Sequence, residues 1–341
     1  MTTNTPHRII ATSPGRPEVL TWEPFDLPTI PPGYLLVETH AAGVNYIDTY
    51  LRSGTYPMHY PGPLGFEGAG TIMGIGDEVG PWAVGDHVAW ASAPGSYATH
   101  VLVPVDNAIR LPESLDLTTA AALPLQGLTA HYLAHDSHNI TADDWVLIHA
   151  GAGGVGLLLT QLAKSRGARV ITTVSTEHKE ELSRSAGADH VIRYDTLDDL
   201  TTELPALITN LTTGRLDELG RGPGVDAVYD GVGRDTFDAS LASLRTRGTM
   251  VLYGGASGQV PPFDLQRLNH EGSLTITRPS LGHFTATHTE LQRRADELIN
   301  LINNGDLTVR IGQTWPLPQA AEAHRALESR KTTGKTLLMM P

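Results

Sequence analysis

The sequence contains no cysteine in its 341 residues. It therefore has no disulfide framework, no catalytic thiolate and no thiolate-ligated metal site. It also lacks an excess of positive charge, because 24 Lys and Arg residues are outnumbered by 37 Asp and Glu residues, which gives a net charge of −13. This balance argues against nucleic acid or an anionic membrane as a general partner.

Long hydrophobic runs are absent as well. No apolar stretch is long enough to span a bilayer, and the first residues carry neither the charged nor the apolar region of a secretory signal. We therefore expect a cytoplasmic protein with no membrane partner. With 40% hydrophobic and 18% charged residues, the chain has the composition of a globular protein, and its length predicts two domains.

The pattern of apolar residues changes twice along the chain. The first 127 residues hold short alternating runs separated by Gly and Pro turns, which predicts a compact antiparallel or barrel-like β domain. From about 128 to 282, short apolar strands alternate with helical stretches such as 177–186, closed by Gly187, and 235–244, closed by Gly248. This alternation is typical of a doubly wound parallel sheet. The tail predicts helices at 290–303 and 318–329 and a strand at 335–340, and the stretch 214–224 predicts a surface loop.

Residues 145–156, WVLIHAGAGGVG, predict a buried strand, a glycine turn and the start of a helix. In a dinucleotide-binding turn, Gly151 allows the sharp turn, Gly153 lets the backbone approach a pyrophosphate, and Gly156 lets the helix pack on the strand. The free N–H groups of the helix N-terminus then bind the phosphates. An ordinary strand–helix turn is the alternative. The predicted cofactor-binding residues of this turn are Gly151, Gly153, Gly154, Val155 and Gly156.

The end of the second predicted strand indicates which dinucleotide binds. An NAD-type site places a carboxylate there, about 20 residues beyond the glycine turn. This sequence instead offers the hydroxyls of Ser175 and Thr176 and the positive charge of Lys179. Hydroxyls and a cation suit a 2′-phosphate and favour NADP(H), although a lone lysine is often only a solvated helix residue.

Two later turns lie at the carboxyl ends of predicted strands, where ligands of such sheets bind. They are 228–233 (VYDGVG) and 253–258 (YGGASG). Plain turns would have the same sequences. The residues expected to line the cofactor are Gly231, Val232, Tyr253, Gly254 and Ser257.

Several motifs together resemble those of one known family. GVNYIDTYLRSGTYP at 43–57, LGFEGAG at 64–70, ALPLQGLTA at 122–130 and TRPSL at 277–281 resemble motifs of the quinone oxidoreductases related to zeta-crystallin, in the medium-chain dehydrogenase/reductase superfamily. The resemblance covers nearly the whole chain. It implies an α/β protein with a GroES-like catalytic domain (1–127 and 283–341) and a doubly wound Rossmann domain for NADP(H) (128–282).

The same resemblance implies roles for individual residues. Lys179 and Arg330 would flank the 2′-phosphate, with Tyr194 beside the adenosine. Asn45 and Thr129 would lie toward the nicotinamide, and Tyr50 would also contact the cofactor. Tyr50 and Tyr56 would border the substrate cleft, either as functional groups or as plain wall residues. The residues that the resemblance places at the reaction are Asn45, Tyr50, Tyr56 and Thr129.

The resemblance also shows which metal ligands are missing. Zinc alcohol dehydrogenases of the superfamily carry a Cys in the front motif and a Gly-His-Glu triplet, whereas this chain has Asn45 and Phe66 in those places. Phe cannot ligate zinc, and a chain without Cys cannot form a four-thiolate site. We interpret the three closely spaced histidines, His131, His135 and His138, as helix-surface or packing residues. We predict no metal.

These features predict an NADPH-dependent quinone reductase. Without a Lewis acid to stabilise an alkoxide, reduction of an electron-poor acceptor held over the nicotinamide in the interdomain cleft is favoured. The alternatives are an enone or 2-alkenal reductase, a zinc-free carbonyl reductase, and a non-catalytic NADPH-binding protein of the crystallin or RNA-binding kind. The predicted edge strand at 274–276 suggests a homodimer.

Overall fold

A computed structural model describes residues 5–214 and 220–341. The chain divides into two compact units: unit 1 is Met1–Leu128 with Thr285–Pro341, and unit 2 is Thr129–Phe284. The sequence placed these divisions after residues 127 and 282, and the structure places them after residues 128 and 284. The predicted loop at 214–224 falls partly outside the described residues.

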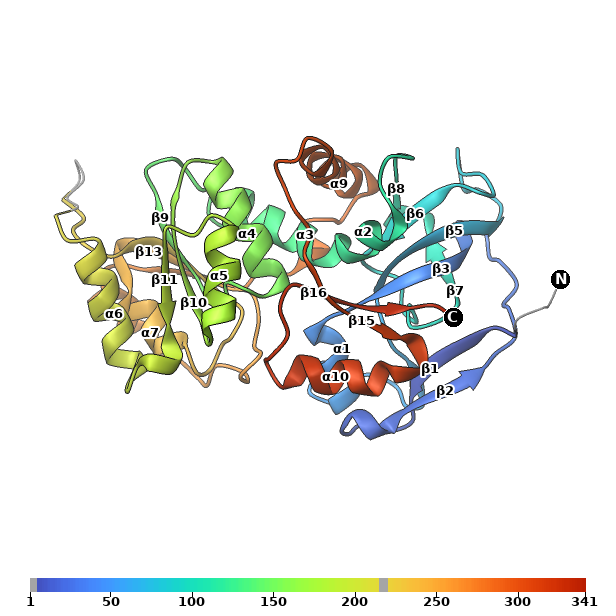
Figure 1. The fold of residues 1–341 in the computed structure, drawn as a ribbon, viewed down its shortest axis with the longest axis horizontal. Coiled ribbons are helices and arrows are strands. Elements are labelled where there is room, and N and C mark those ends of the chain that lie inside the picture. The colour runs from blue at the N-terminus through green and yellow to red at the C-terminus, as the bar shows by residue number, and fades with distance from the viewer. Residues whose placement is uncertain (1–4, 215–219) are drawn as a thin grey trace. The chain divides into compact units, whose positions relative to one another are not determined.

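Unit 2 is built on a six-stranded sheet in which all neighbouring strands are parallel (Figure 1). Its spatial order is β11-β10-β9-β12-β13-β14, the doubly wound order whose direction reverses between β9 and β12. Each strand falls on one of the predicted apolar runs. The strands are β9 (Trp145–Ile148), β10 (Arg169–Val174), β11 (His190–Arg193), β12 (Val225–Asp230), β13 (Leu244–Leu252) and β14 (Thr275–Thr277).

The helices of unit 2 connect these strands and bury their apolar sides against the sheet. Leu147, Ile171 and Val228 from the strands pack with Leu204 and Phe237 from the helices in one core cluster. The longer helices are α4 (Gly154–Ser165), α5 (Glu177–Ser185), α6 (Leu200–Leu211), α7 (Phe237–Ala242) and α8 (Gln266–His270). Short helical segments are η3 (Leu133–Ser137), η4 (Tyr194–Thr196) and η5 (Leu281–His283).

The prediction for 235–244 is partly wrong. The helix α7 ends at Ala242, and Leu244 already belongs to β13, where it pairs with Val225. Gly248 therefore lies inside a strand and does not close the helix. The alternating pattern of this strand is interrupted by Arg247, whose φ of 63° marks an irregularity that sequence periodicity did not show.

Unit 1 contains two sheets. The larger has the order β15-β16-β3-β5-β6-β8, with β7 also paired to β3, and the smaller has the order β2-β1-β4. All pairs in them are antiparallel except β15 with β16. The strands are β1 (His7–Ala11), β2 (Leu20–Pro24), β3 (Tyr34–Val44), β4 (Gly62–Pro63), β5 (Glu67–Ile75), β6 (His87–Trp90), β7 (His100–Pro104), β8 (Ala108–Arg110), β15 (Ile311–Pro316) and β16 (Lys335–Met339).

The last strand brings the end of the chain beside the front motif. β16 pairs with β3, so that Leu337 lies opposite Gly43, and β3 pairs in turn with β5, where Gly43 lies opposite Glu67. This register places three distant segments at one end of the sheet. The helices of unit 1 are α1 (Tyr46–Ser53), α2 (Leu117–Ala122), α9 (His288–Asn303) and α10 (Ala320–Glu328), with η1 (Pro17–Val19), η2 (Val105–Asn107) and η6 (Leu317–Gln319). The chain passes from unit 1 to unit 2 within α3 (Pro124–Tyr132).

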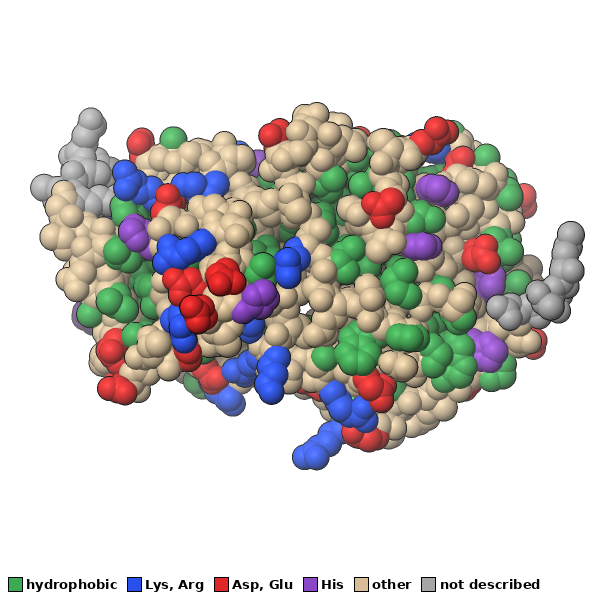
Figure 2. Space-filling model, in the orientation of Figure 1, with side chains coloured by type: hydrophobic (Ala, Val, Ile, Leu, Met, Phe, Trp, Pro, Cys, Tyr) green, Lys and Arg blue, Asp and Glu red, His purple; other side chains and the backbone are tan. Residues whose placement is uncertain are grey.

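The described part of the chain has no helix with the length and apolar character needed to cross a membrane. On the face drawn in Figure 2, Lys and Arg side chains are interspersed with Asp and Glu side chains.

Candidate active site

The glycine turn of unit 2 joins β9 to α4, and its glycines have different surroundings. A Cβ on Gly156 would lie 2.3 Å from the carbonyl oxygen of Ala150, so this glycine is required for the close packing of helix on turn. A Cβ on Gly153 would meet that same oxygen at 3.2 Å and nothing else within 4 Å. Gly153 is the N-cap of α4, and the turn is therefore open to a ligand at the end of this 12-residue helix.

The role predicted for Gly151 needs a correction. The left-handed residue of the turn is Ala150, with a φ of 53°, and Gly151 does not have a positive φ. Gly151 is required for a different reason, because a Cβ there would lie 2.5 Å from Cβ of Thr172 on the neighbouring strand. Gly154 and Val155, at the first two positions of α4, are half-buried.

The two later turns predicted to line the cofactor are bonded to each other. The N–H of Ser257 donates to the carbonyl of Val232 at 2.8 Å, and the Ser257 hydroxyl donates to the same carbonyl at 2.8 Å. A Cβ on Gly231 would lie 2.8 Å from Cζ and the hydroxyl oxygen of Tyr253, and a Cβ on Gly254 would lie 2.4 Å from the Gly231 carbonyl oxygen. These five predicted residues therefore form one tightly packed surface beside the ends of β12 and β13.

A buried hydrogen-bond network fixes the carboxyl ends of three strands. Asp230 accepts from the N–H groups of Val232 and Gly233, at 2.8 and 2.9 Å, and from the hydroxyls of Thr236 and Ser240. Because the Ser240 hydroxyl proton is used on Asp230, its oxygen accepts from Nε2–H of His149, 3.0 Å away.

His149 then extends this network to the neighbouring strand. Its Nδ1 accepts from the hydroxyl of Thr173 at 2.9 Å. Burial lowers the pKa of His149, which keeps the ring neutral and suits one donor and one acceptor nitrogen. The ends of β9, β10 and β12 are thereby locked in place around the ligand-binding edge of the sheet.

The end of β10 carries the predicted phosphate-binding residues. The Lys179 ammonium donates to the hydroxyl of Ser175 at 3.3 Å, and Thr176 caps α5 by accepting from the N–H of Lys179. Partial burial lowers the pKa of Lys179. Val174 pairs with Arg193, so Ser175 and Tyr194 follow the ends of adjacent parallel strands. Four predicted residues, Ser175, Thr176, Lys179 and Tyr194, thus lie at one corner of unit 2.

The last predicted residue of unit 2, Thr129, is buried on α3. It hydrogen-bonds to Tyr132, whose pKa burial raises to about 12 and whose ring stacks on Phe284 at 4.4 Å.

In unit 1, Asn45 lies in a buried cluster of charged groups. Its Nδ2 donates to Oε2 of Glu67 at 2.7 Å, and its Oδ1 accepts from Nζ of Lys335 at 2.8 Å. Lys335 also bonds directly to Glu67, whose Oε1 accepts from the N–H of Leu125 at 2.7 Å. Gln126 donates to the Asn45 amide oxygen at 3.4 Å. The carboxylate and the ammonium therefore fix the orientation of the amide, with its nitrogen toward Glu67 and its oxygen toward Lys335.

This cluster does not fit a zinc ion. Glu67 and Lys335 are 0% and 1% exposed at their side chains, and the ammonium already contacts both the Asn45 oxygen and the carboxylate. A dication beside the same oxygens would face the Lys335 charge in a buried region, where like charges repel more strongly than in water. Phe66 adds no ligand, and within the described residues no three His, Cys, Asp or Glu side chains are grouped to hold a metal.

The three closely spaced histidines have other contacts. The rings of His131 and His135 stack with centroids 4.2 Å apart, and Nε2 of His138 lies 3.2 Å from Oδ2 of Asp144. His131 is buried.

Two of the predicted substrate residues lie side by side at α1. The rings of Tyr50 and Tyr56 meet edge to face with centroids 5.3 Å apart, and the Tyr56 N–H donates to the Tyr50 carbonyl at 3.0 Å. Gly54, with a φ of 81°, ends the helix and turns the chain back between them. Both rings are half-buried, which leaves part of each aromatic surface accessible.

A chain of buried hydrogen bonds joins α1 to α10. The N–H of Asn45 and the hydroxyl of Tyr97 both donate to Oδ2 of Asp48, at 2.8 and 2.9 Å. The Tyr97 oxygen therefore accepts from Nε2 of His324, 3.1 Å away, and the other ring nitrogen accepts from Arg52 at 3.2 Å.

Burial shifts the pKa of three groups in this hydrogen-bond chain, and it raises the pKa of the Tyr97 hydroxyl. It lowers the pKa of His324 to about 3, with a smaller contribution from Arg52, and raises the pKa of Asp48 to about 7. Within the described part of the chain, Oδ1 of Asp48 is buried and has no hydrogen-bond partner, whereas Oδ2 accepts two hydrogen bonds.

Arg330, the remaining predicted residue, is exposed and follows the C-terminal end of α10. Its φ of 59° lies in the left-handed region, where glycine is the usual residue of a helix end.

Sequence reasoning missed the residues that hold Asn45 and Asp230 in place. Glu67 was visible only as the surviving acid of a zinc-type triplet, and Lys335 lies 290 positions from Asn45. No local pattern connects them. His149 directly precedes the glycine turn, and a polar residue at the end of an apolar strand was the available signal.

Comparison with known proteins agrees with this arrangement. The family described as alcohol dehydrogenase GroES-like domain matches residues 31–113, and the family described as zinc-binding dehydrogenase matches residues 154–301. The chain is 41% identical to quinone oxidoreductase 1 of Escherichia coli over 329 residues, covering 95% of this chain and 97% of that protein. It is 37% identical to a 2-haloacrylate reductase of Burkholderia over 333 residues, covering 95% and 96%.

A solved structure shows the same fold. A mycobacterial protein in complex with NADPH matches with a TM-score of 0.92 and 47% identity, covering 98% of this chain and 100% of that one. With the predicted motifs, the six-stranded doubly wound sheet and full-length relatives in agreement, the chain belongs to the quinone oxidoreductase family of the medium-chain dehydrogenase/reductase superfamily.

Proposed function

We propose that this protein transfers reducing equivalents from NADPH to a quinone without the help of a metal. The observation that carries the proposal is the edge of the unit 2 sheet. There an open glycine turn lies beside β10, whose last residue is followed by Ser175, and Lys179 of α5 donates to the Ser175 hydroxyl. Membership in the quinone oxidoreductase family supports the choice of acceptor.

The residues of unit 2 suit a dinucleotide phosphate. The N-terminus of α4 offers N–H groups and the positive end of a helix dipole to a pyrophosphate, and Gly153 leaves room for its approach. The packed surface of Gly231, Tyr253 and Ser257 supplies a fixed wall next to it. The cofactor, when bound, supplies the hydride, and the protein supplies binding and orientation.

Lys179 and Arg330 are proposed as ligands of the 2′-phosphate, with Tyr194 beside the adenosine. The backbone of Arg330 supports this role. A non-glycine residue at a φ of 59° costs stability, and residues held in such conformations cluster at ligand-binding sites. Replacing Lys179 or Arg330 with Ala should weaken NADPH binding at least tenfold, since each loses a charge-assisted contact of roughly 1.5–3 kcal/mol, and should leave NADH binding nearly unchanged. Equal losses for both cofactors would remove the assignment.

Asn45 and Thr129 are proposed to lie toward the nicotinamide, and Tyr50 and Tyr56 toward the acceptor. The adjoining rings of the two tyrosines suit stacking with a planar quinone, and their hydroxyls suit hydrogen bonding to its oxygens. Orientation and exclusion of water then contribute most of the rate, because a quinone accepts hydride without Lewis-acid activation.

The experiment that tests the proposal is the loss of reduced-nicotinamide absorbance with chelator-treated protein, NADPH or NADH, and a panel of quinones, enones and aldehydes. We expect turnover of quinones with NADPH. Faster turnover of enones would favour the second candidate function, an enone or haloalkenoate reductase, which the Burkholderia relative supports. Tight NADPH binding with no turnover across the panel would favour a non-catalytic binding protein.

We further propose a cytoplasmic homodimer. The strand β14 is the edge of the unit 2 sheet, with β13 on its only paired side among the described residues, and an edge strand is a ready site for pairing with a second copy. A monomeric mass by light scattering would rule the dimer out.

A further inference from the structure

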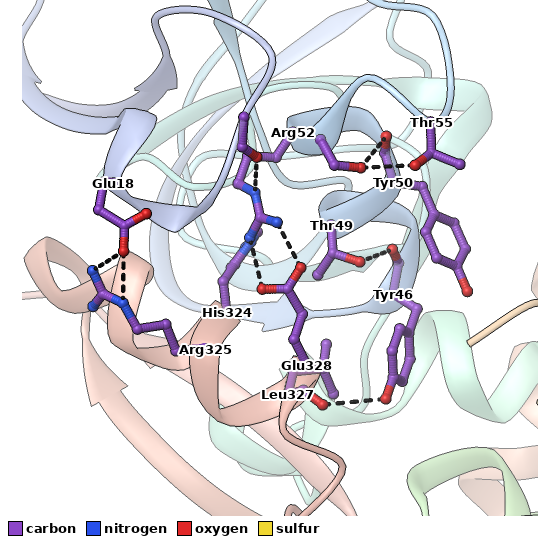
Figure 3. Close-up of polar contacts among 12 residues, drawn as sticks. Glu18, Tyr46, Thr49, Tyr50, Arg52, Thr55, His324, Arg325, Leu327 and Glu328 are labelled. Atoms are coloured by element: carbon purple, nitrogen blue, oxygen red, sulfur yellow. Dashed lines mark hydrogen bonds and ion pairs between the residues drawn. The ribbon is translucent and has the colours of Figure 1, made fainter. Parts of the chain in front are cut away.

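The end of α10 that precedes Arg330 is tied to α1 by two contacts (Figure 3). The Arg52 guanidinium donates to both carboxylate oxygens of Glu328, with Nη2 to Oε1 at 2.5 Å and Nη1 to Oε2 at 3.2 Å. The hydroxyl of Tyr46 donates to the carbonyl of Leu327 at 3.2 Å. Residues of the last helical turn are thus held from the side by the first helix of the chain.

The Leu327 carbonyl is also the acceptor that shapes the turn after the helix. The N–H of Arg330 donates to it at 3.1 Å while the backbone of Arg330 is left-handed. One carbonyl oxygen therefore receives both the Tyr46 hydroxyl and the Arg330 N–H. A shift of this carbonyl relative to α1 would carry the Arg330 backbone with it.

The Arg52 side chain is itself rigidly held. Its side chain is 3% exposed, its Nε donates to the carbonyl of Gly15 at 3.1 Å, and its Nη1 also faces Nδ1 of His324. A bidentate guanidinium–carboxylate pair fixes direction as well as distance. The position of Glu328 is therefore set by the Arg52 guanidinium, which is buried and held by its other hydrogen bonds.

A second ion pair on the same helix has no buried partner. The Arg325 guanidinium of α10 donates through Nε and Nη2 to a single oxygen, Oε1 of Glu18, at 3.1 and 2.9 Å, and both side chains are exposed, at 45% and 61%. In the first pair Arg52 is 3% exposed and Glu328 is 36% exposed. Figure 3 shows the two pairs on α10, with Arg52 reaching Glu328 and Glu18 reaching Arg325. An exposed pair of this kind contributes little to position or stability.

We propose that Arg52 and Glu328 are positioning residues for the cofactor's 2′-phosphate: their pair and the Tyr46–Leu327 bond hold the end of α10 so that Arg330 is oriented for the phosphate. This inference rests on the proposed role of Arg330. It makes the preference for NADPH over NADH depend on a contact that touches neither cofactor.

The test is the dissociation constant of the full-length protein for NADPH and for NADH, measured separately in each variant. Glu328→Gln keeps the size of the side chain and removes its charge. We expect its NADPH dissociation constant to rise about three- to tenfold, the range of couplings carried through packed contacts, with NADH changed less than twofold. Tyr46→Phe should also raise the NADPH dissociation constant relative to the NADH dissociation constant, by a smaller factor. Glu18→Gln, the matched control on α10, should leave the ratio unchanged.

Two variants combined separate this inference from the proposed function. The quantity compared is the NADPH dissociation constant divided by the NADH dissociation constant. If Glu328 acts through Arg330, then adding Glu328→Gln to the Arg330→Ala variant should not change this ratio further. Equal weakening of both cofactors by Glu328→Gln, or a loss of thermal stability with an unchanged ratio of the two dissociation constants, would overturn the positioning role while Arg330→Ala still raised that ratio. An unchanged ratio in Arg330→Ala would instead overturn the phosphate assignment itself.

Discussion

The two units build their functional groups from different parts of the chain. In unit 2 the candidate binding surface consists mainly of backbone: a glycine turn, two further turns and the ends of parallel strands, each a continuous piece of sequence. In unit 1 it consists of side chains from separate segments, with Asn45, Glu67 and Lys335 joined only by the pairing of β3, β5 and β16.

This difference fits what each surface is proposed to bind. Phosphates are recognised by N–H groups and by close approach, and both depend on backbone shape and small residues. A reacting ring has to be oriented by directed polar groups, and these are held in place by other buried side chains. Substitutions that add side-chain volume should therefore have their main effect in the turns of unit 2, and substitutions that remove a charge should have theirs in the buried cluster of unit 1.

The largest expected effect is in the charged cluster of unit 1. Lys335→Met leaves the Glu67 carboxylate buried without its cation, which should lower the free energy of unfolding by about 3–5 kcal/mol. Chemical denaturation followed by fluorescence measures this change. The double variant Glu67→Gln with Lys335→Met removes both charges and should regain most of the stability.

The double variant also gives the control for function. Its Asn45 amide no longer has an ammonium on one end and a carboxylate on the other, so the amide loses its enforced orientation. Turnover should therefore remain low although the fold is restored. Full recovery of both stability and turnover would mean that the cluster serves the fold alone.

A smaller effect is expected in the glycine turn of unit 2, and two alanine variants separate its two functions. Gly156→Ala places a Cβ 2.3 Å from the Ala150 oxygen and should cost about 1–3 kcal/mol of stability. Gly153→Ala meets only one atom, at 3.2 Å, and should change stability by less than about 1 kcal/mol. Gly153→Ala should nevertheless weaken NADPH binding, because its methyl group points into the space left for a pyrophosphate. Similar stability losses in the two variants would show that the turn has no open side.

The same contrast explains how far the sequence could predict this molecule. The strands of unit 2, the glycine turn and the Ser175–Lys179 corner were predictable, because local patterns encode a strand end, a turn and a helix start. The start of β13 was not, because the irregularity at Arg247 breaks the period on which the prediction depended. The reason for Gly151 was also wrong, since it depends on Thr172 in another strand.

In unit 1 the motif containing Asn45 was recognised, but its partners were not. Lys335 and His324 come from the end of the chain and reach the motif only after β16 and α10 have packed. Their roles depend on burial and on contacts between residues that are more than 200 positions apart in the sequence. Periodicity and local spacing do not encode such contacts. The resemblance to a family pointed to positions such as Arg330, but the contacts that hold these residues in place can be seen only in the folded structure.

The last expected effect concerns the pH dependence of stability, and it tests whether buried titratable groups in unit 1 offset each other. The pKa of Asp48 is raised from 3.8 to about 7, so its contribution to stability is full below pH 4 and is lost as the pH rises toward 7. The pKa of His324 is lowered from 6.5 to about 3, so its contribution is full above pH 6.5 and is lost as the pH falls toward 3. Between pH 4 and 6.5 the two slopes have opposite signs.

Single neutral variants should therefore expose one slope each. Relative to the unchanged protein, Asp48→Asn should become more stable as the pH rises from 4 to 6.5, and His324→Gln should become less stable, by at most about 1.4 kcal/mol per pH unit in either case. The groups that face this pair are Tyr97, Arg52, Lys335 and Glu67, and all of them remain in both variants. Thermal unfolding across this range measures the difference. Profiles parallel to that of the unchanged protein would mean that folding shifts the pKa of neither group, and that the hydrogen-bond chain from Asn45 to Arg52 contributes no pH-dependent stability.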